Sequence, residues 1–464
     1  MKKKVIAIVM ACMLISAMFT ACSSPSPAAD TSPAATPSPA PATTAEASSV
    51  PQAVEKTPAD YTGKVVYWQM NAGAERNAVY EEHATQFNKI YPNVKIELSN
   101  FPSAEAMKKV ELAAASDDMP DACDLASIWI PPLALKGAIL PLDDYIAKWD
   151  GKDEIFTNLL EGSRVYVPDE KIYMLPGNAQ LGILWYRSDL FDAPKTWDEF
   201  YSTVEKYTNK SDKTYGFSIR GVAGVTNALS FMYGYSGITE FFKDGKCTVN
   251  DPLHVTAMEK YYSMYKVNTP ESDITNNFKE MTAVFDSGTA MMILHNTGSY
   301  VDHMKTLGEG KFAAARIPKP INGDVLVDID QAPSGFVMGK TKNANYESAF
   351  AFISYLVGFE AENYRCQKIG IVPTNKKVFE QDWAKAMPHY QLVMDALNSD
   401  STKLVALPLF LPDYNKILSD IGDKGFQNVM LGNTTVKKVL DDMTAAFEKA
   451  NNEYIEMVKT TFNK

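Results

Sequence analysis

Apolar and polar positions follow two different periods along the folded part of the chain, and these periods predict strands that alternate with helices. Residues 63–70 are short, β-branched and aromatic, which is typical of a buried strand. Residues 75–92 place apolar side chains on one helical face before a proline, which predicts a helix that stops there. The next expected elements are a strand at 93–101, a helix at 103–121 and a strand at 122–130.

The same alternation continues toward the C-terminus. Thr196 is a plausible N-cap for a helix over 196–208. Residues 346–360 are apolar nearly all round, which indicates a buried helix, and one apolar stripe runs along a closing helix at 435–462. Further expected elements are extended segments at 214–219 and 228–237, a helix, strand and turn within 283–304, and a strand at 334–343. This order predicts an α/β fold with a covered parallel sheet, in which ligands bind at the carboxyl ends of the strands.

The first residues have the pattern of an export signal. Three lysines, an apolar run over 5–20 and the small Ala21 precede Cys22. This arrangement resembles the lipobox of bacterial lipoproteins, although Phe19 stands where leucine is usual. We therefore predict a signal peptide at 1–21 and lipidation of Cys22, rather than plain secretory cleavage. Residues 22–60 are rich in Pro, Ala, Ser and Thr and lack aromatics before Tyr61, which predicts a disordered tether.

Composition narrows the possible partners. The net charge of −11 argues against nucleic acid and against an electrostatic grip on anionic lipid, so we expect membrane contact through the lipid anchor only. The cysteines after Cys22 are too few and too scattered for a disulfide framework. The five histidines have no metal spacing, so we expect neither a metal nor another cofactor. About 400 residues follow the tether, which suggests two lobes.

The succession of motifs in the folded part resembles one family. In chain order these motifs are VVYWQMN, YPNVKIEL, MPDACDLASIWI, KGAILPLDDYI, KIYMLPGNAQLGILWYRSDLF, PKTWDEF, AVFDSGTAMMIL, TKNANYESAFAFISYL and GIVPTN. This order resembles the extracellular solute-binding proteins (family 1) of ABC importers, in the carbohydrate-binding branch related to maltose-binding protein. The resemblance implies a two-lobed periplasmic-binding-protein fold of class II, in which a cleft closes on its ligand by hinge motion.

By the family pattern, the N-terminal lobe comprises residues 61–177 and 341–372, and the C-terminal lobe comprises 178–340 and 373–464. The implied protein is not an enzyme. It is a monomer, exported and lipid-anchored on the outer face of the cell membrane, of the Gram-positive type. It captures a sugar or oligosaccharide and delivers it to the transmembrane subunits of an ABC permease.

Candidate ligand contacts combine aromatic faces with amides and hydroxyls, which suit sugar rings. Trp68 and Asn71 lie at the end of the first expected strand, and Glu75 begins the following helix. Core packing would explain Trp68 equally well, and a helix start is the alternative explanation for Asn71 and Glu75. Tyr233 and Tyr235 alternate along the expected extended segment, which predicts an aromatic ladder for a sugar ring, although ordinary packing would also explain them. The resemblance implies further contacts in the third strand, after the first crossover, in the HNTGS turn and in two late segments: Ser127, Trp129, Asn178, Gln180, Asn296, Thr297, Ser299, Gln331 and Tyr414. Ser334 is a weaker candidate beside Gln331.

Three alternatives remain. A secreted glycoside hydrolase would need two carboxylates across a cleft, and acidic residues are plentiful. A binding protein for a non-sugar solute would need a charged clamp, for which Arg187 and Arg220 are the nearest candidates. An adhesin or scaffold protein would bind no small molecule.

Overall fold

The computed structural model describes residues 56–464, except for residues 163, 165–168, 330–333, 399–401 and 463–464. Lys56–Lys464 forms one compact unit. The predicted leader at 1–21, the lipidation site Cys22 and Gln331 lie outside the described residues, as does most of the predicted tether at 22–60. Within the described part, no helix is both long and apolar enough to cross a bilayer.

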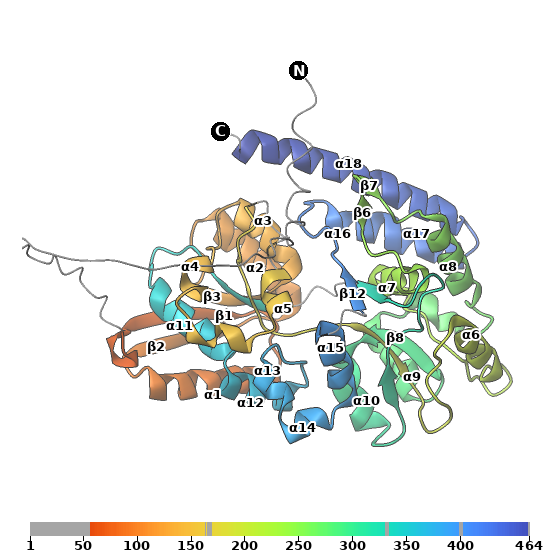
Figure 1. The fold of residues 1–464 in the computed structure, drawn as a ribbon, viewed down its shortest axis with the longest axis horizontal. Coiled ribbons are helices and arrows are strands. Elements are labelled where there is room, and N and C mark those ends of the chain that lie inside the picture. The colour runs from red at the N-terminus through yellow and green to blue at the C-terminus, as the bar shows by residue number, and fades with distance from the viewer. Residues whose placement is uncertain (1–55, 163, 165–168, 330–333, 399–401, 463–464) are drawn as a thin grey trace, which may run out of the picture. The chain divides into compact units, whose positions relative to one another are not determined.

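The first sheet has five strands in the order β2-β1-β3-β11-β4 (Figure 1). β1 lies parallel to β2 and β3, as the strand–helix alternation predicts. β11 runs antiparallel to both β3 and β4, so the sheet is mixed rather than wholly parallel. The bounds are β1 Gly63–Gln69, β2 Val94–Asn100, β3 Ala122–Ala126, β11 Ser334–Met338 and β4 Leu175–Pro176. We call this sheet and the helices packed on it the first lobe.

Aromatic side chains hold the helices of the first lobe to its sheet. α1 (Ala74–Ile90) buries Val79, Tyr80, His83 and Phe87. Phe352 of α11 (Tyr346–Leu356) meets Phe87 of α1 at 5.1 Å and Tyr67 of β1 at 5.2 Å between ring centroids, edge-on in both cases. Ile90, in the last turn of α1, is 48% exposed. α2 (Ser103–Ala115) and α12 (Phe359–Ile369) belong to the same lobe.

The second lobe is built on a three-stranded sheet in the order β8-β5-β9, in which β5 is antiparallel to both neighbours. A parallel pair, β10 and β12, and a short hairpin, β6 and β7, accompany it. The bounds are β5 Gly182–Tyr186, β6 Phe242–Lys243, β7 Lys246–Cys247, β8 Met292–Asn296, β9 Ala313–Ala315, β10 Leu326–Ile329 and β12 Thr402–Val405.

Local sequence signals fix several helices of the second lobe. Thr196 caps α6 (Trp197–Lys206) by accepting a hydrogen bond from the Glu199 N–H at 3.2 Å, which confirms the predicted N-cap. The predicted closing helix is also confirmed as α18 (Val436–Phe462). The other α-helices of the described residues, taken over both lobes, are α3 Ile130–Leu135, α4 Asp143–Ile146, α5 Thr157–Gly162, α7 Val225–Ser236, α8 Pro252–Ser263, α9 Phe278–Asp286, α10 Tyr300–Thr306, α13 Lys376–Phe379, α14 Asp382–Lys385, α15 Pro388–Asn398, α16 Tyr414–Ile417 and α17 Lys424–Met430.

Two expected elements were wrong in type or extent. The segment at 228–237 is not extended but belongs to α7, whose residues from Asn227 to Ser236 are all buried. A helix that is buried all round leaves no periodic signal in the sequence. The strand expected over 122–130 ends at Ala126, and a 3-10 turn, Ser127–Trp129, leads from it into α3.

The position of β11 also differs from the expectation. Residues 334–340 were assigned to the C-terminal lobe, but β11 pairs with β3 from Ser334 to Met338 in the first sheet. The second crossing between the lobes therefore lies between β10 and β11, not near Gly339. Hydrophobic periodicity identifies a strand without indicating which sheet it joins, because the pairing partners are distant in sequence. The other lobe boundaries stay predictions.

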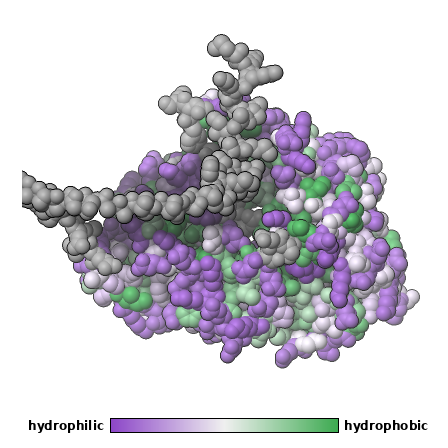
Figure 2. All heavy atoms as spheres, viewed as in Figure 1, coloured by the Kyte–Doolittle hydropathy of each residue, from purple (hydrophilic) through white to green (hydrophobic). Residues whose placement is uncertain are grey.

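The described surface is mixed in character. On the face shown in Figure 2, hydrophobic residues are interspersed with hydrophilic ones. The large hydrophobic side chains that are exposed lie apart in the sequence, as Leu112 and Leu431 do. Such scattered exposure is normal for a folded surface.

Candidate functional site

A cavity of about 370 Å³ opens where the first lobe meets the crossing segment to the second. This volume lies in the range of small-molecule sites. Its walls come from the end of β1, the start of α1, the end of β3, the start of β11 and the end of α12. The crossing segment contributes Gly177, Asn178 and Gln180, and the turn after β8 contributes Gly298. Residues far apart in sequence thus converge on one space.

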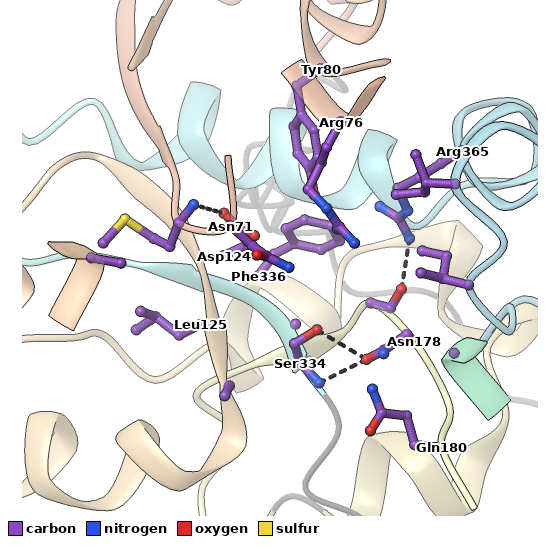
Figure 3. Close-up of a pocket in the computed structure, with 18 of the residues that line it drawn as sticks. Asn71, Arg76, Tyr80, Asp124, Leu125, Asn178, Gln180, Ser334, Phe336 and Arg365 are labelled. Carbon is purple, nitrogen blue, oxygen red and sulfur yellow. Dashed lines mark hydrogen bonds between the residues drawn. The ribbon is translucent and has the colours of Figure 1, made fainter. Parts of the chain in front are cut away.

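Amide groups dominate the side of the cavity formed by the crossing segment (Figure 3). The Asn178 Oδ1 accepts hydrogen bonds from the Ser334 N–H at 2.7 Å and from the Ser334 Oγ at 3.1 Å. The Asn178 amide nitrogen makes no hydrogen bond to a described residue and can donate to a ligand. Gln180 lies beside Asn178, and its amide makes no hydrogen bond to any described residue. These groups can both donate to and accept from hydroxyls.

A carboxylate and an arginine face the cavity from the first lobe (Figure 3). The Asp124 Oδ1 accepts a hydrogen bond from the Met70 N–H at 2.7 Å. Burial raises the pKa of Asp124 to about 6, against the lowering effects of this hydrogen bond and of the Arg76 charge. Tyr80 stands beside them, and burial raises its pKa to about 12.

A buried arginine forms the wall next to α12. Arg365 donates hydrogen bonds to the Gly177 carbonyl at 2.8 Å and to the Leu356 carbonyl at 3.1 Å. It pairs with Glu362 at 3.2 Å, and its guanidinium lies 5.0 Å from the centroid of the Phe336 ring. These contacts hold the Arg365 guanidinium in place, so Arg365 fixes the shape of the cavity wall as well as lining it.

The structure brings four of the predicted contacts to this cavity: Asn71, Trp129, Asn178 and Gln180. Ser334, the weaker candidate, also lines it. Asn71 follows β1, and Trp129 lies in the 3-10 turn after β3. The carboxyl ends of two neighbouring parallel strands therefore deliver both residues to one edge of the sheet, as the fold predicts.

Other candidates from the first lobe do not line the cavity. Trp68 meets Phe101 edge-on, with ring centroids 5.2 Å apart, and packs against the core. Glu75 is exposed in the first turn of α1. Ser127 is fully buried, and its hydroxyl has no hydrogen-bond partner in the described structure. Nothing in the structure supports the ligand contacts predicted for these three residues.

The predicted aromatic ladder was wrong. Tyr233 and Tyr235 lie in α7 with 0% and 4% of their surface exposed, because this helix is enclosed in the core. The Tyr233 hydroxyl is within hydrogen-bond distance of the Thr248 hydroxyl at 2.8 Å. Tyr414 is also buried in this core and lies apart from the cavity. Packing, the alternative considered for the two α7 tyrosines, explains their burial.

The HNTGS turn reaches two cavities. Asn296 stabilises the turn, because its Oδ1 accepts the Gly298 N–H at 3.0 Å. Gly298 lines the main cavity, and Asn296 lines a smaller one. Thr297 and Ser299 are buried, and the Ser299 hydroxyl lies 3.1 Å from the His295 Nδ1. These two residues support the turn rather than lining either cavity.

Sequence reasoning missed three charged lining residues: Arg76, Asp124 and Arg365. The sequence did mark Asp124, because an acidic residue in an otherwise apolar strand indicates a polar environment around its side chain. Arg76 and Arg365 lie on helices with no local mark of a site. Among the described residues, no group of three or more His, Cys, Asp or Glu is placed to hold a metal ion.

The two lobes of this chain and the polar cavity that they line are the arrangement found in two-lobed binding proteins. The structure of the sugar-binding protein MalE from Xanthomonas citri matches with a TM-score of 0.71 at 20% identity, covering 86% of this chain and 99% of that one. At this level of identity the likeness establishes the fold.

The family is established by sequence. The profile described as "Bacterial extracellular solute-binding protein" matches residues 82–391, more than half of the chain. The chain belongs to this family.

Curated relatives match over part of their length. A probable ABC transporter-binding protein of Deinococcus radiodurans is 24% identical over 255 residues, which is 51% of this chain and 59% of the relative. A maltotriose-binding protein of Pyrococcus abyssi is 27% identical over 175 residues, 37% of each chain. The chain thus aligns with less than two thirds of either relative.

Proposed function

We propose that this protein is the substrate-binding lipoprotein of an ABC transporter, which captures a sugar or oligosaccharide between its lobes and presents it to a membrane permease. The observation that carries the proposal is the cavity of about 370 Å³, which collects residues from both lobes in a chain of the extracellular solute-binding family. Closure by hinge motion would enclose the ligand and create the form that a permease recognises.

The chemistry of the lining favours a saccharide. Asn178 and Gln180 offer amides, Ser334 offers a hydroxyl, and Trp129 offers an aromatic surface for the apolar side of a sugar ring. The relative from Pyrococcus abyssi binds maltotriose, and the structural neighbour from Xanthomonas citri is a sugar-binding protein. Both support a carbohydrate as the ligand class.

Binding without chemistry is part of the proposal. Glycoside hydrolysis uses two carboxylates on either side of the bond to be cleaved. Of the described residues that line the cavity, Asp124 is the one with a carboxylate. Glu362 lies behind the wall, fully buried and paired with Arg365. This distribution favours a receptor over the hydrolase considered as an alternative.

The proposal also includes lipid anchoring at Cys22, which would hold a monomeric receptor on the outer face of the cell membrane. The apolar run at 5–20, Ala21 and the tether at 22–60 support it. The test is Cys22→Ser followed by fractionation of cells. We expect the wild type in the membrane fraction and the variant in the soluble fraction. A wild type that is already wholly soluble would contradict the anchor.

The binding function is tested by thermal-shift screening followed by calorimetry on the purified chain. The panel should contain mono- and oligosaccharides beside amino acids, peptides and polyamines. We expect a saccharide to raise the melting temperature and to bind with micromolar affinity, about −8 kcal/mol. Binding confined to a non-sugar would refute the carbohydrate assignment. Release of reducing ends from an oligosaccharide would show a hydrolase.

A further inference from the structure

A second cavity of about 140 Å³ lies in the second lobe and borders the same segments as the main cavity. Gln180 lines the main cavity, and Gly182 lines the second. At the end of the paired strand β8, Asn296 lines the second cavity, and Gly298 in the turn that follows lines the main cavity. Gly182 and Asn296 face each other in the register of β5 and β8, so one strand end borders both spaces.

Among the described residues that line the second cavity, Arg220 is the one that carries a charge. His295 is neutral there, and the other side chains have no ionisable group. The Arg220 Nε donates to the Val222 carbonyl at 3.1 Å, and the Arg220 guanidinium lies 5.9 Å from the centroid of the Phe278 ring. The two terminal amino groups make no hydrogen bond to any described residue. A half-buried cation thus presents unused donors.

No described residue forms an ion pair with Arg220. Burial lowers the pKa of Arg220, although the nearby charge of Asp423 acts in the opposite direction. Burial and the charge of Arg220 lower the pKa of His295 to about 3, so this histidine is neutral at pH 7. Asp423 accepts the Val225 N–H at 2.9 Å, and no ion pair within 4.0 Å joins it to Arg220 in the described structure. Asp328 lies behind the cavity wall, where it accepts the Ser230 hydroxyl at 2.6 Å.

We infer that Arg220 receives a carboxylate of the bound saccharide, so that the ligand is an oligosaccharide carrying a uronate. This inference rests on the proposed function, because it assigns the ligand class within the same cleft. A guanidinium with free terminal nitrogens forms two parallel hydrogen bonds to a carboxylate, whereas a neutral hydroxyl has no matching charge. The Thr226 hydroxyl, which makes no hydrogen bond to a described residue, adds a group for a ring hydroxyl.

The sizes of the cavities support a ligand of more than one ring. The second cavity is below the usual range for a complete small-molecule site, and the main cavity lies within that range. A uronate ring at Arg220 would therefore continue into the main cavity along Gln180 and Gly182. Among the described lining residues, the main cavity carries the Asp124 carboxylate, which would repel a uronate, whereas no carboxylate lines the second cavity. The uronate carboxylate is therefore placed at Arg220.

The test is calorimetry on the full chain with size-matched trimers. Neutral trimers of glucose, mannose and galactose are compared with trimers of glucuronate, mannuronate and galacturonate. We expect a uronate trimer to bind at least tenfold more tightly than its neutral counterpart, and its affinity to fall as sodium chloride is raised. Arg220→Gln should remove this preference, and Arg220→Lys should keep part of it, because the charge remains without the planar fork.

Arg187→Gln is the matched control, since Arg187 pairs with Asp189 and lines neither cavity. It should leave the preference unchanged. Neutral trimers that bind as tightly as uronates, with affinity independent of salt and of Arg220→Gln, would overturn the inference and leave the proposed function standing. If no saccharide binds at all, the proposed function itself fails. Should Arg220→Gln not fold, the wild-type salt dependence and Arg220→Lys decide.

Discussion

Arg365 donates a hydrogen bond from its guanidinium to the Gly177 carbonyl at 2.8 Å, although 188 residues separate the two in sequence. Gly177 begins the segment that crosses to the second lobe, and Arg365 lies on α12. Glu362, in turn, accepts the Thr374 N–H at 3.1 Å and the Asn375 N–H at 2.7 Å. One buried ion pair therefore joins two chain segments that pass beside the cavity.

We expect Arg365→Met to lower the free energy of unfolding by about 3–5 kcal/mol. The substitution keeps an apolar stem but leaves the Glu362 carboxylate, which is 0% exposed, without its cation. Urea denaturation followed by tryptophan fluorescence measures the change. Lys438→Met is the control, because its ion pair with Asp442 is exposed and should contribute little. A loss below about 1 kcal/mol for Arg365→Met would contradict the role assigned to the buried pair.

The carboxylate of Asp124 makes stability depend on pH. Burial raises its pKa to about 6 from 3.8, so the folded state holds a proton that the unfolded state releases. The resulting stabilisation is fully present below about pH 4 and is lost as the pH rises through about 6. Because one pKa unit corresponds to about 1.4 kcal/mol, this contribution is at most about 3 kcal/mol.

Asp124→Asn should remove that dependence while keeping an oxygen to accept the Met70 N–H. The measurement is the difference in unfolding free energy between wild type and variant from pH 4 to pH 7. We expect the variant to gain stability relative to the wild type as the pH rises. Asp273 and Asp328 also have raised pKa values, but they contribute equally to both proteins and cancel in the difference. A difference in unfolding free energy that stays constant with pH would contradict the raised pKa of Asp124.

Elements with local signals were predictable from the sequence. The capping box of Thr196 and Glu199 involves residues three apart, so the start of α6 is visible without tertiary information. The one-sided apolar stripe of α18 has the same advantage. Asn71 and Trp129 follow from the rule that ligands meet the carboxyl ends of parallel strands.

Features decided by tertiary contacts escaped prediction. The alternating aromatic residues of α7 fit a strand as well as a helix, and only its enclosure on all sides settles the question. The place of β11 depends on pairing with β3, which lies about 200 residues earlier in the chain. Arg365 meets Gly177 across a similar separation, so no local pattern marks it as part of the cavity wall.

Ligand binding should make the folded unit more compact. The main cavity is lined by the first lobe, by the crossing segment and by Gly298 of the second lobe, so closure on a ligand brings the lobes together. Small-angle X-ray scattering with and without a saccharide found by calorimetry should show a smaller radius of gyration in the bound state. A saccharide that shows no binding by calorimetry serves as the control. Proven binding with an unchanged radius would contradict hinge closure.

Trp129 and Tyr233 should respond in opposite ways to truncation, because only Trp129 lines the main cavity. Trp129→Ala removes an aromatic face that can stack on a sugar ring, so we expect saccharide affinity to fall at least tenfold. Trp129→Phe should retain part of the affinity. A melting temperature close to that of the wild type would show that Trp129→Ala acts on binding rather than on folding.

Tyr233→Ala should instead destabilise the protein by about 3–5 kcal/mol, the cost of removing a large aromatic side chain from a core. Tyr233 is 0% exposed, and its ring meets His254 at 4.5 Å between centroids. Tyr233→Phe removes only the hydrogen bond to Thr248 and should cost about 1 kcal/mol. Denaturation curves and calorimetry on the same preparations separate the two roles. If Tyr233→Ala weakened saccharide binding at an unchanged melting temperature, the result would support the ligand contact first predicted for Tyr233 and contradict a purely structural role.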